Sequence, residues 1–130
     1  MQRFTDIKVW QQAHFLALAV YPLSGAFPKE EVYGLVAQLR RAAISTAANI
    51  AEGAKRVTRT EYARFLNIAE GSAAETEYLL RLARDLGFAT KAQVDPLLSQ
   101  AEQVQRMLFQ LRTKVEATGA LSRSAKRRAA

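Results

Sequence analysis

The sequence predicts an all-α protein, folded as an antiparallel up-down-up-down four-helix bundle. Four stretches carry apolar residues at the three-and-four spacing of amphipathic helices, and short connections with helix-capping signals separate them. No stretch shows the alternation of apolar and polar residues that indicates a β-strand. With 130 residues, the chain has the length of one domain. We expect the bundle to occupy residues 1–118, and the basic segment 119–130 to be a disordered tail.

The first predicted helix begins at Thr5 or Asp6, because either side chain can cap free backbone N–H groups. It ends between Pro22 and Gly25, since proline disrupts a helix interior and glycine favours a helix C-terminus. The apolar run Ala13–Tyr21 within it has no signal-type cleavage site, so we interpret it as core. No apolar segment approaches the roughly 20 residues that span a bilayer. We therefore expect no membrane contact and a cytoplasmic location.

The second predicted helix begins at the Phe27-Pro28 pair, because proline suits the first helical turn. It ends near Gly53, which can adopt the left-handed conformation common at helix C-termini. Its second half is apolar around most of its circumference, through Ala42, Ala43, Ile44, Ala47, Ala48 and Ala51. Such a helix is normally buried on more than one side. Because one bundle covers a single side of each helix, we expect a sister subunit to cover the second.

The third predicted helix follows Thr58, which forms a capping-box pattern with Glu61, and ends at Gly87. Small residues surround Gly71 in its middle. A glycine inside a helix costs about 1 kcal/mol relative to alanine, so the close approach of another backbone is the expected compensation. The second and third helices should therefore share a tightly packed seam.

The fourth predicted helix follows a second capping box, formed by Thr90 and Gln93, and ends at Thr118-Gly119. Pro96 lies inside its apolar pattern. Either the helix kinks at this proline, or Asp95 is the true cap and the preceding residues form a separate turn.

One flank of the second helix carries polar residues at spacings of three and four, which are Gln38, Arg41, Ser45, Asn49 and Glu52. Their neighbours are mostly alanine, so some of them should be partly buried and in need of partners. Residues that face them from the third helix are Glu70, Ser72 and Glu75, the two glutamates being candidate counter-charges. We interpret this set as a structural polar seam that fixes helix register or subunit contacts. The alternative is a pocket for a ligand or nucleotide.

The net charge of +7 is unevenly spread along the chain. The final segment is the first basic group, and it carries Arg123, Lys126, Arg127 and Arg128 and no acidic residue. The second basic group lies at the turn between the second and third helices, and consists of Lys55, Arg56, Arg59 and Arg64. In a ring of subunits the second group would repeat around one rim and create a substantial positive field. Both groups are candidate phosphate contacts for RNA or DNA, without base reading. The alternative is a solvated turn and a solubilising tail.

Few residues are suited to catalysis. The chain has no cysteine, and its one histidine, His14, cannot supply the two Glu-x-x-His motifs of a di-iron bundle. No glycine-rich phosphate loop is present, and no histidine is placed to activate Ser45 or Ser72. We therefore predict that the protein is not an enzyme and uses no metal or other cofactor. We interpret His14 as a partly buried structural residue, with a general base as the alternative.

Several of these segments resemble a known family. The segments are FTDIKVWQQA, FPKEEVYGLVAQLRRAAISTAANIAEG, EYARFLNIAEGSAAETEYLL and LGF, within a stretch from about Phe4 to Val115. They resemble the four-helix-bundle proteins encoded in intervening sequences of bacterial 23S ribosomal RNA genes. The most specific blocks are QLRRAAIS, NIAEG and GSAAE, and the residues at the family's motif positions are Arg41, Ser45, Asn49, Glu52, Ser72 and Glu75.

The resemblance implies an antiparallel four-helix bundle that assembles as a homopentamer. Related proteins include the accessory variability proteins of diversity-generating retroelements, which form pentameric barrels, bind nucleic acid and associate with a reverse transcriptase. By this likeness the basic residues would serve RNA or DNA. Our prediction is a non-enzymatic, oligomeric nucleic-acid-binding protein. The alternative is a protein-interaction scaffold, for a reverse transcriptase or another partner, whose basic character is incidental.

Overall fold

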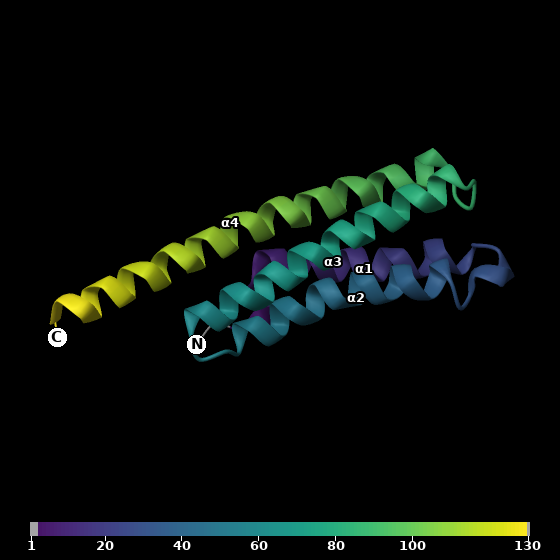
Figure 1. Ribbon diagram of the computed structural model, residues 1–130. Helices are drawn as coiled ribbons and strands as arrows, with labels where there is room; N and C mark the ends of the chain where they lie inside the picture. The colour runs from purple at the N-terminus through teal and green to yellow at the C-terminus, as the bar shows by residue number, and fades with distance from the viewer. Residues whose placement is uncertain (1–2, 130) are drawn as a thin grey trace.

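The computed structural model describes residues 3–129, and the side chains of residues 3–119, 127 and 128. The described chain forms η1 (Phe4–Asp6), α1 (Lys8–Gly25), η2 (Lys29–Glu31), α2 (Leu35–Ala54), α3 (Arg59–Asp85) and α4 (Lys91–Ala129), the η elements being 3-10 turns. Consecutive helices run in opposite directions (Figure 1). Both α1 and α3 pack on α2 and α4. The predicted all-helical, four-helix bundle is therefore confirmed, since no strand occurs in the described residues.

Two groups of buried apolar side chains form the core, and all four helices contribute to each group. One lies towards the end where α1 joins α2, and includes Leu39 and Leu80. The other lies towards the α2–α3 turn, and includes Ile50 and Leu66. All four of these side chains are completely buried. Burial of a side chain of this size stabilises a fold by about 1.5–3 kcal/mol, so the apolar faces seen in the sequence hold the bundle together.

The first helix begins later than predicted and ends within the predicted range. Residues Phe4–Asp6 form the turn η1, and α1 begins at Lys8 without a side-chain cap. Pro22 lies within α1, which ends at Gly25. The hydroxyl of the buried Ser24 donates to the Val20 carbonyl at 2.7 Å.

The second helix begins later than the sequence predicted. Pro28 is followed by the turn η2, and α2 begins only at Leu35. The break falls at Gly34, whose φ of −104° and ψ of −109° lie outside the helical region. The Glu31 carboxylate then accepts a hydrogen bond from the Leu35 N–H at 3.3 Å, so an acidic side chain satisfies a free donor at the start of α2.

Gly53 has a different role from the one predicted. It lies inside α2, and Gly87 is the described glycine with a positive φ, of 76°. A Cβ atom at position 53 would lie 2.8 Å from the Phe65 Cβ atom and 3.1 Å from a ring carbon of Tyr62. The absence of a side chain at Gly53 therefore allows α2 and α3 to approach closely, just before the turn that joins them.

The start of α4 resolves the alternatives for Pro96. The Thr90 hydroxyl accepts from the Gln93 N–H at 3.2 Å, and the Gln93 side chain accepts from the Thr90 N–H at 2.9 Å. The capping box is thus complete, and α4 begins at Lys91 with Pro96 inside it. Asp95 does not cap the helix. Its carboxylate instead accepts a hydrogen bond from Arg84 of α3 at 3.2 Å.

The last helix continues through the segment in which the sequence predicted a disordered tail. It reaches Ala129 and extends past the ends of the other helices (Figure 1). Gly119 lies inside it, although an interior glycine costs about 1 kcal/mol relative to alanine. The following alanine, leucine, lysine and arginine residues favour the helix, and basic side chains near its C-terminus complement the helix dipole.

No helix in the described part of the chain combines the length and the apolar character needed to cross a lipid bilayer.

Replacement of Thr90 by alanine tests the capping box of α4. Thr90→Ala removes the acceptor for the Gln93 N–H. We expect the free energy of unfolding to fall by about 1 kcal/mol, measured by urea unfolding monitored by circular dichroism. The control is Lys91→Ala, at an exposed neighbour outside the capping box, which should unfold as the wild type does. Equal urea midpoints for Thr90→Ala and the wild type would contradict the role of the cap.

Replacement of Gly53 by alanine tests the close approach of α2 and α3. The added Cβ atom overlaps the Phe65 Cβ atom, so we expect thermal denaturation to show a loss of about 1–3 kcal/mol. The matched control is Gly25→Ala at the end of α1, where a Cβ atom would lie 3.6 Å from Arg40 Nη2, an ordinary contact. If both variants melt like the wild type, α2 and α3 have room at Gly53 and this account of the glycine is wrong.

Candidate nucleic-acid interface

The predicted basic group surrounds the connection from α2 to α3. Lys55 and Arg56 follow the end of α2, Arg59 is the first residue of α3, and Arg64 lies just over one helical turn further on. We call these four residues the basic turn. All four side chains are exposed. Thr58 accepts a hydrogen bond from the Glu61 N–H at 3.2 Å, so the predicted cap fixes where α3 begins and how the basic turn is presented.

Two members of the basic turn are held by the buried ring of Phe65. The guanidinium carbons of Arg56 and Arg64 lie 4.5 and 4.7 Å from the centre of this ring. Arg64 also forms an ion pair with Glu61 at 3.0 Å, and its hydrogen bond lowers the pKa of the Glu61 carboxyl group. Arg56 lies 4.0 Å from Glu52. Their charges are therefore partly balanced within the chain.

The other two members carry positive charge that the described residues do not balance. Neither Lys55 nor Arg59 forms an ion pair with any residue that the structure describes. Arg59 also lies at the N-terminus of α3, where the helix dipole adds positive potential. Lys55 and Arg59 are therefore the members of the basic turn best suited to contact an external anion.

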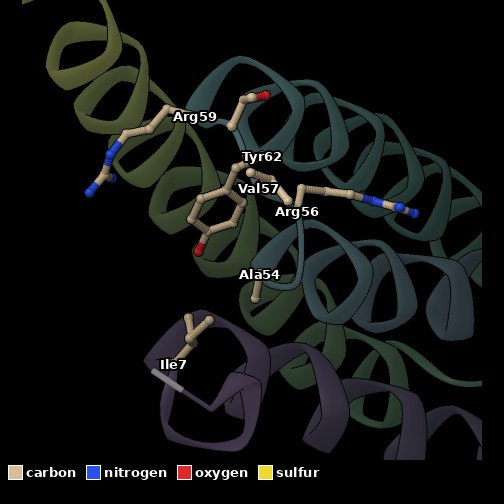
Figure 2. A pocket seen from close by; sticks show the side chains of 7 residues that line it. Ile7, Ala54, Arg56, Val57, Arg59 and Tyr62 are labelled. Atoms are coloured by element: carbon tan, nitrogen blue, oxygen red, sulfur yellow. The ribbon is translucent and has the colours of Figure 1, made fainter. Parts of the chain in front are cut away.

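A cavity of about 290 Å³ opens beside the basic turn. Its lining comes from the residue before α1, the end of α2, the α2–α3 connection and the start of α3. The lining residues are Ile7, Ala54, Arg56, Val57, Thr58, Arg59 and Tyr62. Figure 2 shows the Tyr62 hydroxyl directed towards Ile7 and Ala54, while Arg56 and Arg59 extend to opposite sides. Burial raises the pKa of the Tyr62 phenol, and the positive charge of Arg59 offsets part of this rise.

A second hollow, of about 450 Å³, lies between α3 and α4. Arg59 lines it as well, so this side chain borders both cavities. Across the hollow, Arg112 of α4 forms ion pairs with Glu70 at 3.0 Å and with Glu116 at 2.9 Å. Hydrogen bonding to Glu70 is the main cause of the raised pKa of Arg112. The guanidinium of Arg112 is therefore engaged within the chain, and Arg59 is left to face outwards.

The basic residues of the C-terminal segment lie on the part of α4 that extends past the other helices (Figure 1). Arg127 and Arg128 are exposed. The side chains of Arg123 and Lys126 lie outside the described ones. The two predicted basic groups are thus on different elements, one on the basic turn and one on the last turns of α4.

The centre of the predicted polar seam joins α2 to α3. The hydroxyl oxygens of Ser45 and Ser72 lie 2.9 Å apart. The Asn49 side chain donates to the Ser45 carbonyl at 2.8 Å and to the Ser45 hydroxyl at 3.0 Å. These three residues are half-buried, and their side chains form hydrogen bonds with one another within the bundle.

The outer members of the predicted seam do not join it. Glu70, a candidate counter-charge for this flank, pairs instead with Arg112 of α4. Gln38, Arg41, Glu52 and Glu75 are exposed. Within the described chain neither Arg41 nor Glu75 forms an ion pair. Gly71 also faces outwards, and a Cβ atom there would meet nothing within 4 Å, so the expected close approach does not occur inside the bundle.

The outward sides of α2 and α3 are largely apolar around these two charges. Ile44 is 46% exposed, Ile68 is 40% exposed and Tyr78 is 61% exposed. Ala42, Ala43 and Ala47 are buried as predicted, whereas Ala48 is exposed. We call the surface formed by Arg41, Ile44, Ala48, Ile68, Gly71, Glu75 and Tyr78 the α2–α3 face.

His14, the candidate general base of the sequence analysis, lies on the surface of α1. His14 is exposed and stacks on Trp10 with ring centres 4.9 Å apart, so the expectation of a partly buried histidine is wrong. No group of three or more metal-binding side chains occurs among the described residues.

Sequence reasoning missed Tyr62, which it assigned to the apolar face of the third helix. That assignment is incomplete, because Tyr62 packs on the core cluster and also lines the cavity at the basic turn. A signal was present in the sequence, since Tyr62 lies between Arg59 and Arg64, and aromatic residues among basic ones are typical of single-strand-binding surfaces.

The fold and the sequence of this chain are similar to those of known proteins. No curated protein matches the chain. A protein of unknown function from the S23 ribosomal protein family of Bacteroides thetaiotaomicron VPI-5482 shares 24% sequence identity and a TM-score of 0.74, over 79% of this chain and 96% of that chain. That likeness shows the same four-helix fold. The model of the 23S rRNA-intervening sequence protein family matches residues 5–110, and the chain belongs to this family.

Proposed function

We propose that this protein is a non-enzymatic, cytoplasmic, oligomeric protein that binds RNA or DNA through its basic turn. The observation that carries the proposal is the state of Lys55 and Arg59, which are exposed and without an ion pair in the described chain. Ammonium and guanidinium groups bind phosphate oxygens, and such contacts depend on charge rather than on base sequence. Arg59 also borders two cavities, so it can reach a strand that enters either of them.

The oligomer in this proposal is a ring of identical subunits that meet through the α2–α3 face. Its exposed isoleucines, Ile44 and Ile68, favour burial against another protein surface. Arg41 and Glu75 are opposite charges without partners in the described chain. In a ring, Arg41 of one subunit can pair with Glu75 of the next, and Gly71 then accommodates the neighbouring backbone.

Five subunits is the number that the family resemblance implies. A ring of this kind repeats the basic turn around one rim, because the turn lies at the end of α2 and the start of α3. The positive potentials of the repeated basic turns add together, so the ring attracts a polyanion more strongly than one subunit does.

A second candidate function is that of a protein-interaction scaffold. The outer side of α1 favours it, because Phe15 and Leu18 are each 55% exposed and lie outside the α2–α3 face. Apolar side chains gathered on a surface mark contact sites for other proteins. Under this alternative the basic residues have no direct nucleic-acid role, and a dedicated protein partner occupies α1.

Replacement of Arg59 by glutamine tests the nucleic-acid proposal. We expect weaker binding to RNA and to duplex DNA, measured by fluorescence anisotropy across a salt series. The slope of log affinity against log salt should become shallower by about 1 for each subunit that contacts the nucleic acid. The matched control is Lys29→Gln, which removes the same charge at the opposite end of the bundle and should leave both quantities unchanged. Absence of salt-dependent binding by the wild type rejects the proposal and favours the scaffold.

A charge exchange tests the ring. Arg41→Glu and Glu75→Arg each place like charges across the proposed contact, so each should reduce the mass measured by light scattering. The double variant restores opposite charges and should recover the wild-type mass. Circular dichroism should show an unchanged fold in all three variants, because both residues are exposed. A monomeric wild type at micromolar concentration, or single variants that keep the wild-type mass, would reject the proposed face.

A further inference from the structure

The cavity at the basic turn has an unusual lining for a surface that contacts only phosphates. Ile7, Ala54, Val57 and the ring of Tyr62 make much of it apolar. Val57 is 102% exposed, the most exposed of the large apolar residues that the structure describes, and lies at the tip of the turn. Phosphate contacts need cationic and hydrogen-bonding groups, so they leave this apolar lining unexplained.

Tyr62 presents both a flat face and a polar group to this cavity. It packs against the core on one side, and its hydroxyl forms no hydrogen bond within the described chain. Figure 2 shows that hydroxyl directed into the cavity. A half-buried phenol without a partner can donate to a ligand, while the ring offers a surface for stacking.

The surrounding structure holds Tyr62 in place. A Cβ atom at Gly53 would lie only 3.1 Å from a ring carbon of Tyr62, so the glycine leaves room for the tyrosine ring to pack closely against α2. Thr58 caps α3 and sets the direction of its first turn, which carries Tyr62. The cavity is therefore formed by the end of α2 and the start of α3 together with the turn residues Arg56–Thr58 that join them.

We propose that this cavity receives one unpaired base of a single-stranded nucleic acid, stacked on Tyr62, and that the protein therefore prefers single strands to duplexes. The inference rests on the proposed nucleic-acid function and specifies its ligand class. Arg56 and Arg59 extend to opposite sides of the cavity, as Figure 2 shows. They are thus placed for the phosphates on either side of the inserted base. Arg56 reaches one of them from its position over Phe65.

The size of the cavity fits this ligand class. Its volume of about 290 Å³ lies at the small end of ligand sites. It suits a single base rather than a large organic ligand. In a duplex each base is paired and stacked, so its faces are unavailable unless unpairing energy is supplied. Stacking on an aromatic ring accepts every base, so the preference is for strandedness and not for sequence.

Three fluorescein-labelled probes of equal length test the inference in anisotropy titrations of the full chain. They are an oligothymidylate, a strand of abasic sugar-phosphates and a duplex. We expect the oligothymidylate to bind more tightly than the abasic strand, by roughly 5- to 150-fold for each base engaged. The duplex should bind more weakly than the oligothymidylate. Arg59→Gln should weaken the binding of all three probes.

Two variants alter the cavity without a change in charge. Tyr62→Leu removes the aromatic face and keeps an apolar side chain against the core, and Ala54→Leu fills the cavity from the end of α2. Each should reduce oligothymidylate affinity to that of the abasic strand and leave abasic binding unchanged. Tyr62→Phe retains the ring and should keep most of the preference. Thermal melting identifies a variant that fails to fold. Because Ala54→Leu changes α2 and Tyr62→Leu changes α3, either variant can test the cavity if the other does not fold.

The outcomes separate this inference from the proposed function. Equal, salt-dependent binding of the oligothymidylate and the abasic strand overturns the base site and leaves phosphate binding intact. Duplex binding as tight as that of the oligothymidylate overturns the single-strand preference. Failure of every probe to bind rejects the nucleic-acid function itself. A protein partner that is lost in Ala54→Leu, together with equal binding of the first two probes, assigns the cavity to a protein side chain.

Discussion

The close packing of α2 against α3 is the constraint on which the candidate interface depends. At one point Gly53 brings the α2 backbone against Tyr62 and Phe65, where no other residue fits without displacement. Further along, the hydroxyls of Ser45 and Ser72 meet at 2.9 Å. These two contacts hold the helices in one register, so the turn between them presents its basic side chains in a defined geometry.

The four residues of the basic turn differ in whether they contact Phe65 and in whether they form ion pairs. The buried ring of Phe65 supports Arg56 and Arg64, whose carboxylate partners balance part of their charge. Lys55 and Arg59 have no ion pair among the described residues. Exposed ion pairs contribute little to stability, so the arrangement is better understood as an organisation of charge than as a source of folding free energy.

The two faces of α2 have different relations to the fold. The inner face, with Ala43 and Ile50, is buried in the bundle core. The outer face carries Ile44 and Ala48, which are exposed in the single chain. An alanine-rich helix whose outer side is also apolar has more surface to bury than its own bundle can cover. The proposed ring and the proposed base site use different parts of α2, its outer face and its last residue, so their tests are independent.

The sequence alone determined the four helices, the family and the position of the basic turn, because each depends on local patterns. Helical periodicity and the capping boxes at Thr58 and Thr90 involve residues three or four positions apart, whose geometry the helix itself sets. Only the tertiary structure decided that Glu70 pairs with Arg112, 42 positions away, or that Ile7 and Tyr62 border one cavity. It also showed that the glycine at position 53 allows α2 and α3 to approach closely, rather than providing a left-handed residue at the end of α2. These properties depend on distances between helices, which a one-dimensional pattern does not contain.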